Sequence, residues 1–495
     1  MNYLSTRNRD LRMSASEAIA KGLAPDGGLL TPAVLPRLPA SAVETMKEMS
    51  YQQRVVYILN SFLEGFAASE LATYASEAYG GGKFSHEDVA PVRKLDDNTW
   101  CLELWHGPTC AFKDMALQIL PHLLTASLEK NDEKKTVCIL VATSGDTGKA
   151  ALEGFRNVDK TKVLVFYPKD GVSDIQEFQM VTQEGGNVGV SSVAGNFDDA
   201  QAGVKALFAD EELATELAEQ GFFLSSANSI NWGRVLPQIV YYVSAYCDLL
   251  KSGAIAKGQS INVCVPTGNF GNILAAYYTK EMGIPINKLI CASNRNNVLT
   301  DFINTGAYDC SRTFYNTISP SMDILISSNL ERMLFELSGR NDKLVKEYMS
   351  QLAEYGSYRV DSSIRTKLKR IFSAGCCDDT QTKAMIARMW NEKGYLIDPH
   401  TAVAFHVLEE YRTETGDDTV TVTVSTASPF KFCDSVLDAL GVQQKLDGLE
   451  ILDQLSSHTG VPVPMPLARL KTRKRRFSGV TEKSAMKDCV LDFLK

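Results

Sequence analysis

From Thr99 onward the chain alternates between short apolar runs and segments whose apolar residues recur at helical spacing. Continuous apolar runs of this length are typical of strands that are buried on both faces. Alternation of such strands with helices favours βαβ units and parallel sheets. The pattern therefore predicts an α/β fold with strands at Val137–Ala142, Val163–Tyr167, Val188–Val193, Ile261–Val265, Leu289–Ala292 and Thr419–Val424.

The length of 495 residues allows two or three domains. Residues 1–92 form the first predicted domain, because Ser14–Lys21 and Tyr51–Leu63 show helical spacing before the Gly80–Gly82 stretch. Residues 93–495 form the second and larger domain. Within it, a charged, helix-rich segment at about 340–395 is predicted to be an insertion on the outside.

Composition excludes several classes of function. A net charge of −8 and a pI of about 5.5 argue against broad nucleic-acid binding. No apolar run approaches the roughly 20 residues of a membrane helix, and the first residues lack a secretory apolar region. The 11 cysteines are scattered, as in proteins with reduced thiols. We therefore expect a cytoplasmic protein without a membrane or nucleic-acid partner, and without a metal site, since the histidines lack ligand spacing.

One lysine, Lys113, stands out because it lies in the largely apolar segment Leu104–Ala116, between a Gly-Pro turn and an expected helix start. Most lysines are solvated surface charges. A lysine held in a partly desolvated pocket has a lowered pKa and can form a Schiff base with an aldehyde cofactor. Lys113 is thus the candidate for covalent catalysis.

Two loops that follow predicted strands are suited to bind anions. Thr143–Gly148 gathers hydroxyl groups and backbone amides where a strand gives way to a helix. Gly268–Asn272 also lies between a strand and a helix, and its two glycines let backbone amides approach an anion. Neither loop has the Gly-Lys-Ser/Thr of a P-loop or the spacing of a dinucleotide fingerprint. Ligands of parallel sheets bind beyond the carboxyl ends of the strands. Both loops are therefore expected to share one site.

These motifs together resemble the pyridoxal-phosphate enzymes of the tryptophan-synthase-β-like fold (fold type II). More narrowly, the chain is similar to threonine synthases of the long bacterial and fungal type. Further matching segments follow in the family's order and cover nearly the whole chain: Tyr3–Arg7, Gly22–Leu29, Ser226–Gln238, Asp398–Val403 and Ser425–Phe432. The resemblance implies two open parallel-sheet lobes, the smaller at about 110–240, behind an N-terminal helical or mixed domain.

The resemblance also implies pyridoxal 5'-phosphate as cofactor and assigns roles to residues. Lys113 would carry the cofactor and act as the catalytic base, with Thr426 facing the pyridine nitrogen. The cofactor phosphate would be bound by Gly268, Asn269, Phe270, Gly271 and Asn272. The substrate would be bound by Thr109, Thr143, Ser144, Asp146, Thr147, Asn228, Asn231 and Arg234.

The reaction implied is that of a carbon–oxygen lyase, which turns O-phospho-L-homoserine and water into L-threonine and phosphate. Two alternatives remain within the enzymes: a phospho-lyase that releases 2-oxobutyrate, ammonia and phosphate, and a threonine or serine dehydratase. The N-terminal Tyr-x-Ser-Thr-Arg segment disfavours the dehydratase. A non-catalytic relative is a third option, which the intact Lys113 disfavours. The expected partner is the small-molecule substrate, and the expected state is a monomer or homodimer.

Overall fold

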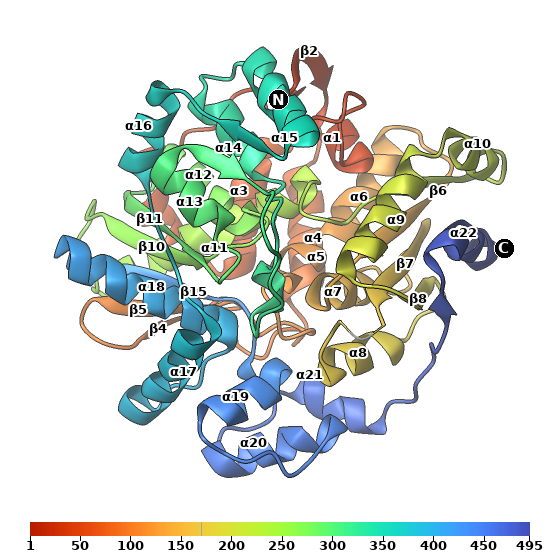
Figure 1. Ribbon diagram of the computed structural model, residues 1–495. Coiled ribbons are helices and arrows are strands. Elements are labelled where there is room, and N and C mark those ends of the chain that lie inside the picture. The colour runs from red at the N-terminus through yellow and green to blue at the C-terminus, as the bar shows by residue number, and fades with distance from the viewer. Residues whose placement is uncertain (170) are drawn as a thin grey trace.

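The computed structural model describes residues 1–169 and 171–495, and it contains two large, mainly parallel sheets that lie side by side (Figure 1). The larger sheet has six strands in the order β14-β11-β10-β15-β5-β4. Its strands are parallel except for β4, which pairs antiparallel with β5. Their bounds are β4 Val92–Lys94, β5 Thr99–Glu103, β10 Ile261–Pro266, β11 Ile286–Ser293, β14 Phe372–Cys376 and β15 Thr421–Ser425.

The smaller sheet has five parallel strands in the order β16-β8-β7-β6-β9. Four of them come from one continuous stretch: β6 Thr136–Ala142, β7 Thr161–Pro168, β8 Val188–Val193 and β9 Phe222–Ser225. The fifth, β16 (Val480–Thr481), comes from the far end of the chain and is followed by helix α22 (Met486–Leu494). Met486, Val490 and Leu494 of α22 are buried in the core of this lobe. The C-terminus therefore completes the smaller lobe, on the right in Figure 1.

The first residues form a three-stranded antiparallel sheet, with β1 (Tyr3–Ser5) between β2 (Asn8–Met13) and β3 (Leu30–Pro32). Helix α1 (Ala15–Lys21) begins with a capping box at Ser14, and α3 (Tyr51–Phe62) begins with another at Ser50. Such reciprocal side-chain bonds satisfy backbone groups that a helix start leaves free. Both predicted helices are therefore present, each starting within one residue of its expected position.

Helix α11 (Trp232–Lys251) is buried along most of its length and contacts α3 as well as α12 (Gly271–Glu281). It joins the smaller lobe to the larger one, and its first turn follows the loop 226–231 directly. A helix that is apolar nearly all round belongs in the core. The position of this loop is thus determined by the core of the molecule.

The α/β class and the two parallel sheets are as predicted. The segment at about 340–395 contains three helices, α15 (Asp342–Tyr355), α16 (Ser362–Ile371) and α17 (Asp379–Lys393). It also contains β14, which pairs with β11 and so forms one edge of the larger sheet. No helix among the described residues is long and apolar enough to cross a membrane.

Candidate active site

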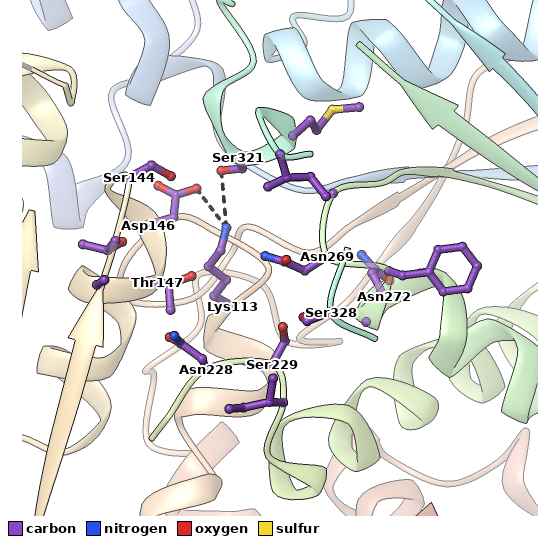
Figure 2. Close-up of a pocket in the computed structure, with 18 of the residues that line it drawn as sticks. Lys113, Ser144, Asp146, Thr147, Asn228, Ser229, Asn269, Asn272, Ser321 and Ser328 are labelled. Carbon is purple, nitrogen blue, oxygen red and sulfur yellow. Dashed lines mark hydrogen bonds and ion pairs between the residues drawn. The ribbon is translucent and has the colours of Figure 1, made fainter. Parts of the chain in front are cut away.

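A cavity of about 280 Å³ lies where segments of the two lobes face each other, beyond the carboxyl ends of strands from both sheets. Residues 142–147 line it after β6, residues 266–272 after β10, and Thr426 after β15. Lys113 projects into this space, with Asp146 and Ser321 on one side and Asn228 and Ser229 on the other (Figure 2). The two predicted anion loops and Thr426 therefore line one site.

Lys113 stands immediately before helix α5 (Asp114–Leu117), and only 8% of its surface is exposed. Its Nζ lies 3.5 Å from Asp146 Oδ2 and 3.5 Å from Ser321 Oγ. Desolvation lowers the pKa of Lys113, and the neighbouring cations Lys431 and Arg234 add to this effect, while Asp146 opposes it. A lowered pKa increases the fraction of neutral amine, which is the nucleophilic form.

Asp146 is held between two lysines. Lys431 is fully buried, and its Nζ lies 2.7 Å from Asp146 Oδ1 and donates to the Thr109 carbonyl at 3.0 Å. Gln176 donates to the same carboxylate oxygen at 2.9 Å. These groups hold the pKa of Asp146 well below its usual range, against the opposing effect of burial. Because the carboxylate is paired in this way, an anionic ligand would meet the backbone amides and hydroxyls of this loop instead.

The loop 268–272 leads into α12 through Phe270, which has a left-handed backbone with φ of 62°. A helix start presents free N–H groups and a positive potential. Asn272, in the first turn, accepts hydrogen bonds on Oδ1 from Tyr241 (2.6 Å) and Tyr242 (2.5 Å). Its buried Nδ2 has no partner among the described residues. An unpaired buried donor at a helix start fits a phosphate ligand.

The two glycines of this loop differ in the space that the fold leaves around them. A Cβ on Gly268 would approach the carbonyl oxygen of Ser321 to 2.6 Å, so the neighbouring backbone requires glycine there. A Cβ on Gly271 would meet its nearest neighbour, Asn329 Nδ2, at 3.4 Å. The fold therefore leaves room at Gly271, beside the helix start that would bind an anion.

Arg234 is a buried cation that lines the cavity. It donates from Nη1 to the Ala227 carbonyl at 2.6 Å, and its Nε has no partner in the part of the chain that the structure describes. Burial lowers the pKa of Arg234 to about 10. A buried charge is costly unless it is paired. Arg234 is thus available to an anionic ligand.

Thr426 lines the cavity next to Lys113, because its carbonyl accepts a hydrogen bond from the Phe112 amide at 2.8 Å. The residue before it, Ser425, accepts one from the Trp105 indole at 3.0 Å. The hydroxyl predicted to face a ring nitrogen is therefore at the cavity wall.

The structure does not bring two of the predicted substrate-binding residues, Thr109 and Asn231, to the cavity lining. The Thr109 hydroxyl and amide both donate to Asp114, each at 2.8 Å. Asn231 caps helix α11 by accepting from the Gly233 amide, and donates to the Ile19 carbonyl at 3.1 Å. Hydrogen bonds within the fold occupy both side chains. All other predicted site residues line the cavity.

Sequence reasoning missed Ser229, Ser321, His400 and Lys431. His400 accepts on Nε2 from the Ser321 amide at 3.1 Å, while its Nδ1 lies 2.8 Å from Asp398. His400 and Lys431 lie in two segments that match the family, Asp398–Val403 and Ser425–Phe432, so the sequence carried a signal for them. Ser321 lies between β12 (Ala307–Asp309) and α14 (Leu330–Leu337), in a segment without strands. No strand-to-loop pattern marks such a position.

The residues present fit pyridoxal phosphate: a buried amine at Lys113, a helix start with a free donor at Asn272, and a hydroxyl at Thr426. Fold and site together define a pyridoxal-phosphate-dependent enzyme of the tryptophan-synthase-β-like fold type. Three family models match the chain. They are "Threonine synthase N terminus" over residues 2–79, "Pyridoxal-phosphate dependent enzyme" over 86–363, and "Threonine synthase, C-terminal" over 401–490.

Individual relatives agree with these models. Threonine synthase of Pseudomonas aeruginosa is 40% identical over 88% of this chain and 90% of its own. Human threonine synthase-like 1 is also 40% identical, over 96% of this chain. That relative is longer, and the match covers 64% of its length. The crystal structure of PLP-bound threonine synthase from Brucella melitensis has a TM-score of 0.88 and 37% identity, with all of both chains covered. The yeast enzyme also has a TM-score of 0.88, with 33% identity over 100% of this chain and 98% of its own. The chain belongs to the threonine synthase family.

Proposed function

We propose that this protein is a threonine synthase, which converts O-phospho-L-homoserine and water into L-threonine and phosphate. The observation that carries the proposal is the presence of two different cations in one buried cavity: the amine of Lys113 and the guanidinium of Arg234, which has no carboxylate partner among the described residues. A substrate with an amino group, a carboxylate and a distant phosphate matches this distribution of charge.

Lys113 is assigned to the cofactor aldehyde, and the loop 268–272 with Asn272 Nδ2 to the cofactor phosphate. Pyridoxal phosphate, when bound, supplies an aldehyde for amines and a ring that withdraws electrons from the substrate carbons. Thr426 offers the ring nitrogen a neutral hydroxyl instead of a carboxylate. Such a partner leaves the nitrogen largely unprotonated, which favours elimination and replacement over transamination.

The remaining residues bind and orient the substrate. Amides and hydroxyls of Thr143, Ser144 and Thr147 are assigned to the α-carboxylate, and Arg234 and Asn228 to the phosphate. A guanidinium fork suits phosphate because it donates two parallel hydrogen bonds. Because desolvation lowers the pKa of Lys113, its Nζ is suited to accept a proton from substrate carbon and return it. Asp146 and Ser321 lie within 3.5 Å of that nitrogen and orient it.

A phospho-lyase that releases 2-oxobutyrate, ammonia and phosphate is the second candidate. The chain is 40% identical both to a threonine synthase and to a protein named threonine synthase-like 1, and these identities do not determine which products this chain releases. The deciding experiment is product analysis with O-phospho-L-homoserine. Threonine formed in equal amount with phosphate supports the synthase, whereas 2-oxobutyrate and ammonia without threonine would replace it with the phospho-lyase.

We further propose a cytoplasmic location, which the free state of all 11 cysteines supports.

A further inference from the structure

The loop 226–231 carries Asn228 and Ser229 into the cavity, as seen below Lys113 in Figure 2. Its backbone is held by arginine side chains on two sides. Arg234 bonds to the Ala227 carbonyl from within the cavity wall. Arg332, on helix α14, donates to the carbonyls of Ile230 at 2.6 Å and Ser229 at 3.5 Å.

Arg332 is fully buried and forms no ion pair with a carboxylate among the described residues. Its Nε donates to the Leu30 carbonyl of β3 at 3.0 Å, and its Nη1 donates to Asn329 Oδ1. Burial lowers the pKa of Arg332 to about 10. Burial of a guanidinium costs desolvation free energy. Three of the hydrogen bonds that Arg332 donates go to backbone carbonyls, so its contacts fix the positions of backbone segments.

Asn329 extends the same network to the loop 268–272. It is fully buried, its Nδ2 donates to the Ser229 carbonyl at 3.1 Å, and its amide donates to the Asn269 carbonyl at 3.1 Å. Asn269 belongs to the loop assigned to the cofactor phosphate. Arg332 and Asn329 thus connect three segments: strand β3 of the N-terminal domain, the loop 226–231, and the loop 268–272.

We infer that Arg332, with Asn329, is a positioning residue that holds the loop 226–231 in register with the cofactor loop for binding of the substrate phosphate. The inference rests on the proposed function. It also gives the N-terminal domain a part in substrate binding, through the Leu30 carbonyl. Arg332 itself touches neither the cavity nor a ligand, since it is absent from the cavity lining.

The chain offers a matched control in Arg340. It follows α14, donates to the Pro32 carbonyl of β3 at 3.1 Å, and pairs with Glu336. Arg340 therefore connects the same helix to the same strand but contacts neither the loop 226–231 nor the loop 268–272. Comparison of Arg332→Lys with Arg340→Lys separates positioning of the loop from general support of the N-terminal domain.

The test measures binding of two ligands to the enzyme with cofactor bound. Inorganic phosphate is titrated by calorimetry, and threonine, which lacks phosphate, is followed by the cofactor spectrum. Arg332→Lys is expected to weaken phosphate binding roughly 10- to 100-fold, the range for a lost charged hydrogen bond, with threonine affinity within about twofold of wild type. Arg340→Lys is expected to change neither.

Two results would overturn the inference: unchanged phosphate affinity in Arg332→Lys, or equal losses of phosphate and threonine affinity. If Arg332→Lys does not fold, Asn329→Leu removes the bond to Ser229 while leaving the Arg332 bonds to Leu30 and Ile230, and it is held to the same criteria. Product analysis with wild-type enzyme tests the proposed function separately. A phospho-lyase outcome there would leave the phosphate comparison valid, because both reactions release phosphate.

Discussion

At the scale of single residues, the prediction with the clearest outcome concerns Lys113. Its amine is buried in the cavity and its pKa is lowered by desolvation, so it is the group suited to bind the cofactor aldehyde covalently. After borohydride treatment, the intact mass of the wild-type protein should increase by one reduced cofactor. The Lys113→Ala variant should show no such increase. Lys149→Ala is the control, because Lys149 is also buried but pairs with Glu153 outside the cavity. Cofactor mass retained by Lys113→Ala would contradict the assignment.

Arg234 is the second residue with a specific prediction. Replacement by lysine keeps the charge but loses the fork that matches phosphate. We expect kcat/KM for O-phospho-L-homoserine to fall about 10- to 100-fold, equivalent to roughly 1.5–3 kcal/mol. Threonine binding, read from the cofactor spectrum, should stay nearly unchanged because the loop 143–147 is intact. A variant that lost stability and both ligands together would show that Arg234 is only a structural residue.

At the scale of the elements, Gly268, which precedes α12, and Gly271, its first residue, should respond differently to substitution. Gly271→Val should weaken pyridoxal-phosphate binding strongly, because the side chain would occupy the helix start, while thermal stability of the apo protein changes little. Gly268→Ala should instead lower apo stability, since its Cβ would meet the Ser321 carbonyl oxygen at 2.6 Å. Equilibrium dialysis and thermal unfolding measure the two effects. An unchanged cofactor affinity in Gly271→Val would reject the phosphate site.

The pair formed by Lys431 and Asp146 joins the segment after β15 to the first turn of α7 (Asp146–Gly154). Lys431→Met should cost about 3–5 kcal/mol of unfolding free energy at pH 7, because it leaves a buried carboxylate with one partner fewer. The double variant Lys431→Met/Asp146→Asn should cost less than the sum of the two single variants. Urea unfolding measures all three proteins, and additive losses would show that the pair is not coupled.

The pH dependence of this pair has a definite sign. The pKa of Asp146 is lowered in the folded protein, so its stabilising contribution is present above the ordinary carboxyl pKa of about 3.9. The contribution decreases as the pH falls below that value. The difference in stability between wild type and Asp146→Asn should therefore be constant from pH 5 to 7 and should shrink toward more acidic pH.

At the scale of the whole molecule, the C-terminal segment is predicted to stabilise the smaller lobe. Val490 of α22 is fully buried against that lobe, and β16 pairs with β8. Val490→Asp places a charge in this core, so hydrogen exchange in β7 and β8 should become faster. Exchange in β10 and β11 of the larger sheet should change less. Asp488→Asn, on the exposed face of α22, is the control. Uniform acceleration across both sheets would contradict separate stabilisation of the lobe.

The local pattern of the sequence predicted much of this protein. Apolar runs indicated the strands, because a buried parallel strand needs apolar side chains on both faces. The motifs Gly268–Asn272 and Thr143–Gly148 indicated two anion loops, because each lies between a strand and a helix start. The carboxyl ends of parallel strands meet at one edge, so the two loops were expected in one site. Lys113 was conspicuous because its neighbours are apolar. Each of these features is encoded within a few consecutive residues.

The tertiary structure alone decided the rest. It took β16 from residues 480–481 into a sheet whose other strands end by residue 225, and it brought Ser321 and Lys431 to Lys113 and Asp146. It also gave Thr109 and Asn231 structural partners in place of the cavity. These contacts join residues that are distant in the chain. No local periodicity or motif predicts such contacts, because they depend on how complete elements pack against one another.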